Sequence, residues 1–211
     1  EAFIRPSPSA GSLGGVAEKT REAMLACEAA GYDVILVETV GVGQSETTVA
    51  GMVDMFVLLQ LPNAGDDLQA IKKGIVEIAD LVAINKSDID PRAAAVARSQ
   101  WKQALHMLRP TSPNWRPPVI GVSALKKEGM AEFWAEIERH HQVMSASGEL
   151  EAKRRKQALD WMWSMIESGL HHFFKHHPEV HAALPELTRA VAEGRATPGA
   201  AAHTLLNYLK V

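Results

Sequence analysis

The sequence predicts an α/β protein with a doubly wound, mostly parallel sheet, followed by an α-helical arm. Short apolar runs alternate with segments of helical periodicity over residues 1–146. These runs are apolar throughout, which is typical of strands buried on both faces of a parallel sheet. From Glu149 onward the strand pattern stops and only helical periodicity continues. We therefore expect an α/β domain at 1–146 and a helical arm at 147–211.

The expected elements follow from local signals along the chain. Ala2–Ile4 resembles the end of a strand, and the helical pattern of 16–30 stops at Gly31, a residue that favours helix ends. Apolar runs predict further strands at 34–37, 55–61, 81–84 and 118–122. Helices are expected at 66–80, 91–108, 128–144 and 150–176. Proline favours the first helical position, so helices could begin at Pro178, Pro185 and Pro198.

Composition excludes several classes of function. The net charge of −3 gives no electrostatic case for a nucleic-acid or membrane partner. The single cysteine, Cys27, excludes an internal disulfide and fits a reducing compartment. No apolar run approaches the roughly 20 residues that span a bilayer. We expect a cytoplasmic protein, or a mitochondrial-matrix protein in a eukaryote.

The first chemical motif is the tetrapeptide Asn85-Lys86-Ser87-Asp88, directly after the apolar run 81–84. A carboxylate at Asp88 can accept hydrogen bonds from the N1–H and exocyclic amine of guanine. Adenine has an acceptor at N1 and no 2-amino group, so it would leave this carboxylate unpaired, at a cost of about 1–3 kcal/mol or more. The stem of Lys86 can lie along the base plane, and Asn85 can tie neighbouring loops together. A polar turn between a strand and a helix would also explain the tetrapeptide.

Two further elements occur in the chain order of a GTP-binding protein. Ser123-Ala124-Leu125 ends the next strand, where an S-A loop offers a backbone N–H to the guanine O6. Upstream, Glu38-Thr39-Val40-Gly41 is a variant of the D-x-x-G element. There the carboxylate holds the water shell of Mg²⁺ and the glycine N–H meets the γ-phosphate. Together the three elements predict a site for GTP or GDP with Mg²⁺.

The phosphate cradle G-x-x-x-x-G-K-[ST] does not occur in these residues. The chain also starts without a methionine, inside an apolar stretch. We therefore expect the back part of a longer P-loop GTPase, and we expect this part alone to be inactive as a GTPase.

The runs ETVGVGQSE, LPNAGDDLQAIKKGIVEIADLVAINKSD and ASGELEAKRRKQALDWMW resemble the methylmalonyl-CoA mutase-associated GTPases, the MeaB/ArgK family of metallochaperones. Glu38, in place of aspartate, is the mark of that class. The resemblance implies a chaperone that couples GTP hydrolysis to loading and protecting adenosylcobalamin, a cofactor held by the partner acyl-CoA mutase. It also implies a homodimer formed through the C-terminal helices.

The family resemblance further implies a switch segment that senses nucleotide and mutase, carried by Gln44, Asp66, Gln69, Lys72 and Lys73. From the residues alone a capped surface helix is the favoured explanation of the charges at 66–73, because acids near its start and lysines further along complement the helix dipole. The resemblance shifts the preference to the switch. Val42 stands where Ras-like GTPases have the glutamine that orients water, so intrinsic hydrolysis should be slow.

The helical arm carries an apolar stripe that is wider than one core requires. Its members are Leu159, Met162, Trp163, Ile166, Leu170, Phe173 and Phe174, widened by Ala158, Trp161 and Met165. The stripe favours a dimer interface, with burial inside one chain as the alternative. The nearby histidines at 171, 172, 176 and 177 have helical spacing, and surface histidines explain them better than metal ligands.

Two other functions compete with this interpretation. Older names for relatives describe transport-system kinases for lysine, arginine and ornithine, and an adenine nucleotide would conflict with Asp88. The 211 residues could also act only as a binding or dimerisation module.

Overall fold

The computed structural model describes residues 2–6, 13–39, 45–62, 73–108 and 110–209. The chain divides into two compact units, Glu1–Ala158 and Leu159–Val211.

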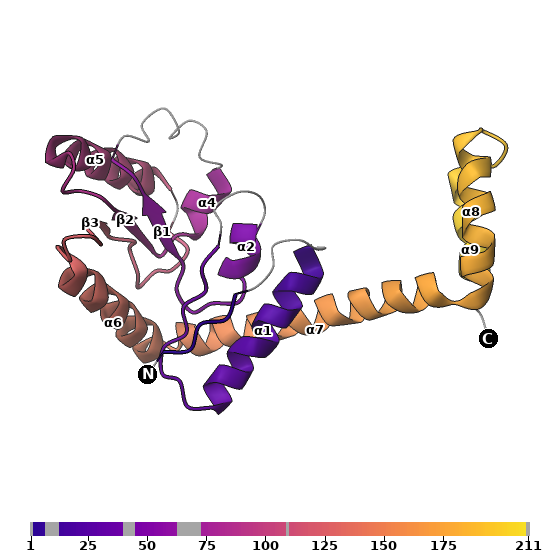
Figure 1. The fold of residues 1–211 in the computed structure, drawn as a ribbon, viewed down its shortest axis with the longest axis horizontal. Helices are drawn as coiled ribbons and strands as arrows, with labels where there is room; N and C mark the ends of the chain where they lie inside the picture. Colours follow the sequence, from indigo (N-terminus) through magenta and orange to yellow (C-terminus); the bar gives the residue numbers. More distant parts are fainter. Residues whose placement is uncertain (1, 7–12, 40–44, 63–72, 109, 210–211) are drawn as a thin grey trace. The chain divides into compact units, whose positions relative to one another are not determined.

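The first unit is built around a parallel three-stranded sheet in the order β1-β2-β3 (Figure 1). The strands are β1 (Val57–Gln60), β2 (Leu81–Ile84) and β3 (Val119–Gly121). In the register, Val57 pairs with Leu81 and Val82 pairs with Val119. The central strand β2 is completely buried, at 0% exposure for all four residues. The predicted parallel strands are confirmed at these three places. Burial on both faces is confirmed for β2 only, because β1 lies at the edge of the described sheet and its Leu59 is 62% exposed.

Helices cover both faces of this sheet. α5 (Pro91–Met107) lies on one side and α6 (Met130–Ala146) on the other (Figure 1). Val82 and Ile84 of β2 pack in one cluster with Trp101 of α5. The alternate residues of β2, Leu81 and Ala83, pack in a second cluster, which Phe133 of α6 covers. Because successive strand side chains point to opposite faces, an uninterrupted apolar run serves both clusters.

Further helices of the first unit lie within the described residues. They are α1 (Leu13–Ala29), α2 (Ser45–Ala50) and α4 (Lys73–Ile78). The expected helix 66–80 is therefore confirmed over 73–78, and its first part lies outside the described residues. Gly31 follows α1 with φ +86°, a left-handed conformation that favours glycine, so the expected helix end is also confirmed.

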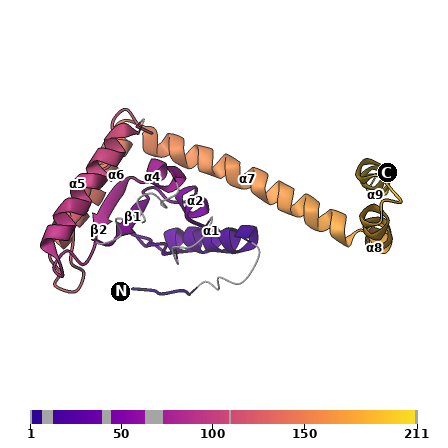
Figure 2. The same cartoon turned by 90° about the horizontal axis from the view of Figure 1, so that it is seen from above.

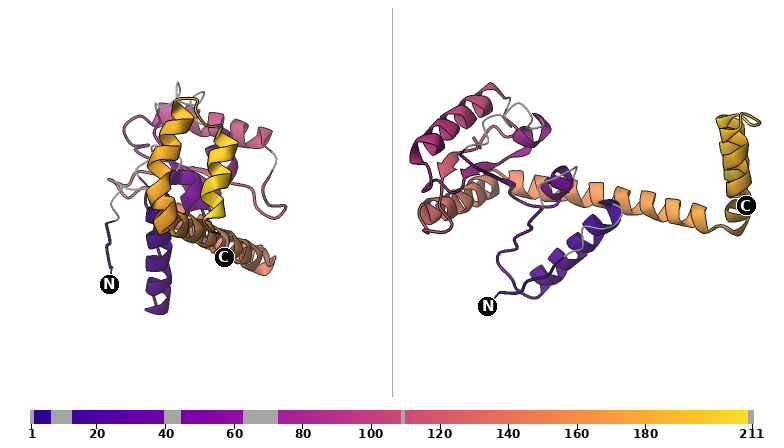
Figure 3. Two further views of the ribbon diagram at one scale, coloured as in Figure 1. Left: turned by 90° about the vertical axis from the view of Figure 1, so that its right-hand side faces the viewer. Right: turned by 45° about the horizontal axis from the view of Figure 1, so that its top comes forward.

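The helical arm begins with one continuous helix, α7 (Glu149–His176), as Figure 2 shows. It is followed by α8 (Pro178–Ala192) and α9 (Pro198–Asn207), which pack side by side (Figure 3). Val180 of α8, at 0% exposure, and Leu205 of α9 are buried. None of the helices in the described part of the chain is long and apolar enough to cross a membrane.

Proline positions test the expected helix starts in the arm. Pro178 and Pro198 stand at the beginnings of α8 and α9, as expected, and the hydroxyl of Thr197 caps α9. The expected start at Pro185 is wrong, because this residue lies inside α8. An interior proline removes one backbone hydrogen bond. The halves of α8 before and after this proline each contain a buried residue, Val180 and Ala190.

The expected strands at Ala2–Ile4 and 34–37 are wrong. Neither segment has strand structure, and their side chains are not buried: Ile4 is 88% exposed and Leu36 is 85% exposed. A strand is defined by a hydrogen-bonded neighbour, and in the described residues β1 pairs only with β2. An apolar run gives no information about the presence of that neighbour.

Candidate functional site

The loops that follow β2 and β3 meet at the carboxyl edge of the sheet. The Asn85 side chain joins them, because its Oδ1 accepts hydrogen bonds from the N–H of Lys86 at 2.8 Å and of Ala124 at 3.2 Å. The Asn85 N–H donates to the carbonyl oxygen of Gln60, at the end of β1, at 2.8 Å. One side chain and its backbone therefore connect the ends of all three strands.

Asp88 presents an ionised carboxylate at this edge. The interaction of the nearby Ser123 hydroxyl with this carboxylate is the main reason why the pKa of Asp88 lies below the usual range. The Lys126 ammonium, 3.8 Å from Asp88 Oδ2, lowers the pKa further. Ser123 is fully buried, and the Asp88 side chain is 9% exposed. The result is a charged acceptor with a defined orientation at neutral pH.

The remaining residues that were predicted to contact the base, Lys86, Ala124 and Leu125, are exposed. Lys86 is exposed and adopts φ +59°, a left-handed conformation that turns the chain sharply out of β2. Ala124 is also exposed, and Leu125 is 89% exposed. The side chains of Lys86 and Leu125 are thus accessible to a flat ring. The structure brings together all six predicted nucleotide-binding residues, 85, 86, 88 and 123–125.

A short closed loop holds Ser123 in place. Its N–H donates to the carbonyl oxygen of Glu128 at 3.0 Å, and the Glu128 N–H donates back to the carbonyl of Ser123 at 3.1 Å. The next residue, Gly129, has φ +72°, and a Cβ atom there would lie 2.5 Å from the carbonyl oxygen of Gly121. Only glycine fits this backbone conformation and this close approach.

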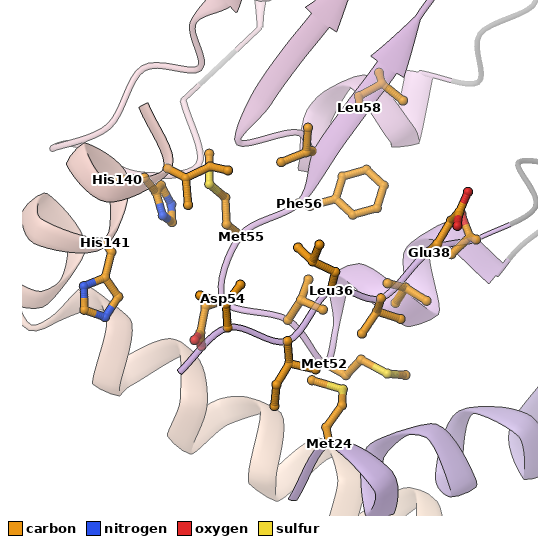
Figure 4. Close-up of a pocket in the computed structure, with 18 of the residues that line it drawn as sticks. Met24, Leu36, Glu38, Met52, Asp54, Met55, Phe56, Leu58, His140 and His141 are labelled. Atoms are coloured by element: carbon orange, nitrogen blue, oxygen red, sulfur yellow. The ribbon is translucent and has the colours of Figure 1, made fainter. Parts of the chain in front are cut away.

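Glu38 does not belong to the loops 85–88 and 122–125. It is exposed on the segment 33–39 and lines a cavity of about 1760 Å³ (Figure 4). Leu36, Met52 and Phe56 give this cavity a mainly apolar lining. Glu46, which also lines it, is 7% exposed, and its Oε2 has no hydrogen-bond partner among the described residues.

The donor set around Glu38 limits what kind of metal it could hold. In the described ranges, no group of three or more His, Cys, Asp or Glu side chains could hold a metal ion. Mg²⁺ usually keeps several waters and takes one or two carboxylates together with substrate phosphates. A single exposed carboxylate therefore fits Mg²⁺, and does not form a complete protein cage.

Several predicted residues cannot be placed. Gly41, Gln44, Asp66, Gln69 and Lys72 lie outside the described residues. Lys73 is the first residue of α4. Histidines 171, 172 and 176 lie exposed on α7, as expected, with the rings of His172 and His176 stacked at 4.0 Å.

Sequence reasoning missed three residues of the site: Ser87, Lys126 and Gly129. Ser87 occupies the variable position of the N-K-x-D motif, and its contacts are with a neighbouring strand. Gly129 follows the second motif by four residues, and a glycine after a polar turn is the only local signal for its role.

A parallel α/β sheet whose carboxyl edge presents an N-K-S-D loop beside an S-A-L loop defines the class of P-loop GTPases. The chain belongs to the family of methylmalonyl Co-A mutase-associated GTPases, MeaB, whose family model matches residues 1–179. Its fold is similar to the crystal structure of an LAO/AO transport system kinase, with a TM-score of 0.76 and 39% identity, over 99% of this chain and 66% of that one.

Similar proteins occur in bacteria and animals. A protein of Caulobacter vibrioides provisionally named a GTPase is 54% identical over 97% of this chain and 63% of its own length. The mitochondrial methylmalonic aciduria type A homolog of Mus musculus is 50% identical, over 99% of this chain and 51% of its own. GTPase ArgK of Escherichia coli is 51% identical, over 82% of this chain and 53% of its own length. The chain thus spans about half to two thirds of the length of these relatives.

Proposed function

We propose that the full-length protein binds GTP and GDP through the loops 85–88 and 122–125, and hydrolyses GTP. The observation that carries this proposal is the Asp88 carboxylate, which lies 3.8 Å from the Lys126 ammonium at the edge where the Asn85 side chain joins the two loops. Guanine offers two N–H donors to such an acceptor, whereas adenine offers a lone pair. Leaving a charged acceptor unpaired is costly, so this residue would select guanine.

The other residues of the edge have supporting roles in this proposal. Asn85 would hold the Ala124 backbone in place, and the loop 123–125 would offer its N–H groups to the guanine O6. The aliphatic stem of Lys86 and the exposed Leu125 would contact the faces of the ring. Because these contacts come from two strands of one sheet, the base site would be largely preformed.

Glu38 and Gly41 are proposed to act at the phosphates. Mg²⁺, when bound with the nucleotide, would neutralise charge on the phosphate oxygens. Glu38 would contact the metal through its water shell, and its exposure leaves room for such a shell. The N–H of Gly41 would donate to the γ-phosphate, and Val42 would leave the attacking water without an orienting side chain.

The biological role proposed here is that of a chaperone for an acyl-CoA mutase. GTP binding and hydrolysis would gate the loading and protection of adenosylcobalamin in methylmalonyl-CoA mutase or a related enzyme, and Gln44, Asp66, Gln69, Lys72 and Lys73 would couple the two proteins. Membership of the mutase-associated family supports this role. We place the protein in the cytoplasm, or in the mitochondrial matrix of a eukaryote.

We propose that residues 1–146 form the GTPase domain and that the helical arm, residues 147–211, forms a homodimer. Much of its apolar stripe on α7 is exposed within the described chain: Leu159 57%, Trp163 58%, Leu170 63% and Phe173 59%. An apolar face of this size is normally covered by a partner.

A nucleotide-dependent transport kinase is the alternative, because a relative of known structure is named an LAO/AO transport system kinase. Calorimetric titration of the full-length protein with GDP, GTP and ADP separates the two. The GTPase proposal expects GDP and GTP to bind at least about a hundredfold more tightly than ADP. Equal affinity for ADP would favour the kinase. Stimulation of GTP turnover by the purified mutase then tests the client.

A further inference from the structure

We propose that Ser87, the variable residue of the N-K-S-D motif, is a positioning residue that sets the guanine preference of Asp88. This inference rests on the proposed function. It assigns a role to a side chain that would not touch the nucleotide and would act through its neighbour.

Two dipeptides, 87–88 and 122–123, are joined by a reciprocal pair of contacts. Ser87 donates twice to the carbonyl oxygen of Val122, from its N–H at 3.1 Å and from its hydroxyl at 2.9 Å. In the opposite direction, the Ser123 hydroxyl interacts with the Asp88 carboxylate and lowers its pKa. The segment 87–88 is thus connected to the segment 122–123 twice, once between Ser87 and Val122 and once between Asp88 and Ser123.

This arrangement continues the parallel pairing of β2 and β3 beyond the last paired residues, Ile84 and Gly121. The ladder still includes the bond from the Val122 N–H to the Ile84 carbonyl, at 2.9 Å. The chain then leaves the sheet at Lys86, whose left-handed backbone ends the regular pairing. After this turn the two donors of Ser87 bring the loop back against β3, directly before Asp88.

The Ser87 side chain lies close to Gly121, the last residue of β3. If Gly121 carried a Cβ atom, that atom would lie 3.7 Å from the Ser87 Cβ and 3.4 Å from the Arg98 Cδ. Alanine fits this space without new contacts and removes only the hydroxyl. The Ser87 N–H bond and the Asn85 link to Ala124 remain in Ser87→Ala, so the sheet edge stays folded.

The expected loss therefore concerns the orientation of Asp88. Guanine needs both carboxylate oxygens aligned, one for N1–H and one for the 2-amino group. Inosine lacks the 2-amino group and needs only one. A carboxylate that is less well fixed should lose more affinity for GDP than for IDP.

The test measures GDP and IDP affinity by calorimetry in the full-length wild type and in Ser87→Ala. A matched control is Ser147→Ala, at the end of α6 and far from Ser87 in the sequence. It also removes a hydroxyl that donates to a backbone carbonyl, that of Met144, at 3.2 Å. We expect the GDP-to-IDP affinity ratio to fall roughly threefold or more in Ser87→Ala, the size of one neutral hydrogen bond, and to stay at the wild-type value in Ser147→Ala.

An unchanged ratio in Ser87→Ala would overturn the proposal, whether or not both affinities fall together, because a merely structural role weakens both nucleotides equally. If Ser87→Ala does not fold, Ser87→Cys keeps the size with a weaker donor, and the same ratio decides. Failure of the proposed function looks different. The wild type itself would then show no preference for GDP over ADP.

Discussion

Lys153 of α7 places its Nζ atom 3.4 Å from Oδ2 of Asp80, the residue that precedes β2. The same ammonium donates to the carbonyl oxygen of Asp54 at 2.8 Å. Asp80 Oδ2 also accepts the backbone N–H of Phe56 at 2.9 Å, just before β1. These contacts attach the first turns of α7 to the amino ends of two strands, at the edge of the sheet opposite the candidate base site.

We expect Asp80→Ala to lower the free energy of unfolding by about 1–3 kcal/mol, because the Phe56 N–H and the Lys153 ammonium both lose a partly buried acceptor. Urea denaturation measures the change. Glu151→Ala is the control, since its pair with Arg155 is exposed on the same helix, and it should remain close to wild type. Equal stability of Asp80→Ala and wild type would contradict the anchoring role.

His140 makes the stability of this anchor depend on pH. Burial lowers the pKa of His140 below its ordinary value, although Asp80 acts in the opposite direction; Lys153, Asp54 and His141 also influence it. In the window below about pH 6.5 the unfolded chain therefore binds more protons than the folded one. Stability should fall as the pH drops through this window.

Thermal unfolding between pH 5 and 7.5 tests this expectation with His140→Gln, which should show a shallower dependence on pH than the wild type. His141→Gln, a change at the exposed neighbouring histidine, should keep the wild-type dependence. A wild-type slope in His140→Gln would show that other groups determine the effect.

Gly129→Ala should destabilise the protein by about 1–3 kcal/mol, through its left-handed backbone and the contact of the new Cβ with the Gly121 carbonyl. Gly148→Ala is a matched control, with φ +75° and nothing within 4 Å of its Cβ position. The difference between the two variants isolates the steric contact. We also expect weaker GDP binding in Gly129→Ala only, because the loop that holds Ser123 is displaced.

Asp88→Asn should weaken GDP binding at least about tenfold, because one acceptor becomes a donor that faces a donor. The variant should gain affinity for xanthine nucleotides, whose C2 carbonyl replaces the amine. Asp90→Asn is the control: Asp90 caps α5 by accepting the N–H groups of Arg92 and Ala93, and asparagine caps equally well. Unchanged GDP affinity in Asp88→Asn would remove this residue from the base site.

Glu38→Ala should leave GDP affinity nearly unchanged and slow GTP hydrolysis by about 10²–10³, the usual effect of removing one preorganised electrostatic group. The measurements are calorimetry and single-turnover hydrolysis on the full-length protein. Asp33→Ala, on the same exposed segment, should keep wild-type turnover. Wild-type turnover in Glu38→Ala would mean that the end of the segment 33–39 is not catalytic.

The sequence alone determined the parts of this protein in which local and global signals agree. The apolar run of β2 and the motif Asn85-Lys86-Ser87-Asp88 are adjacent, so one stretch predicted both a buried strand and the chemistry at its end. Parallel pairing then placed Ser123 beside it, because the carboxyl ends of parallel strands lie at one edge of a sheet.

Only the tertiary structure decided the features that depend on distant partners. The run 34–37 has the composition of a strand, yet no neighbour in the described chain pairs with it. The approach of Gly129 to Gly121 and the bond from Ser87 to Val122 likewise join residues whose local sequences do not indicate each other. Composition and periodicity report how well a segment can be buried or capped, whereas a strand pairing or a close contact requires a second segment at a particular distance, and the fold alone supplies it.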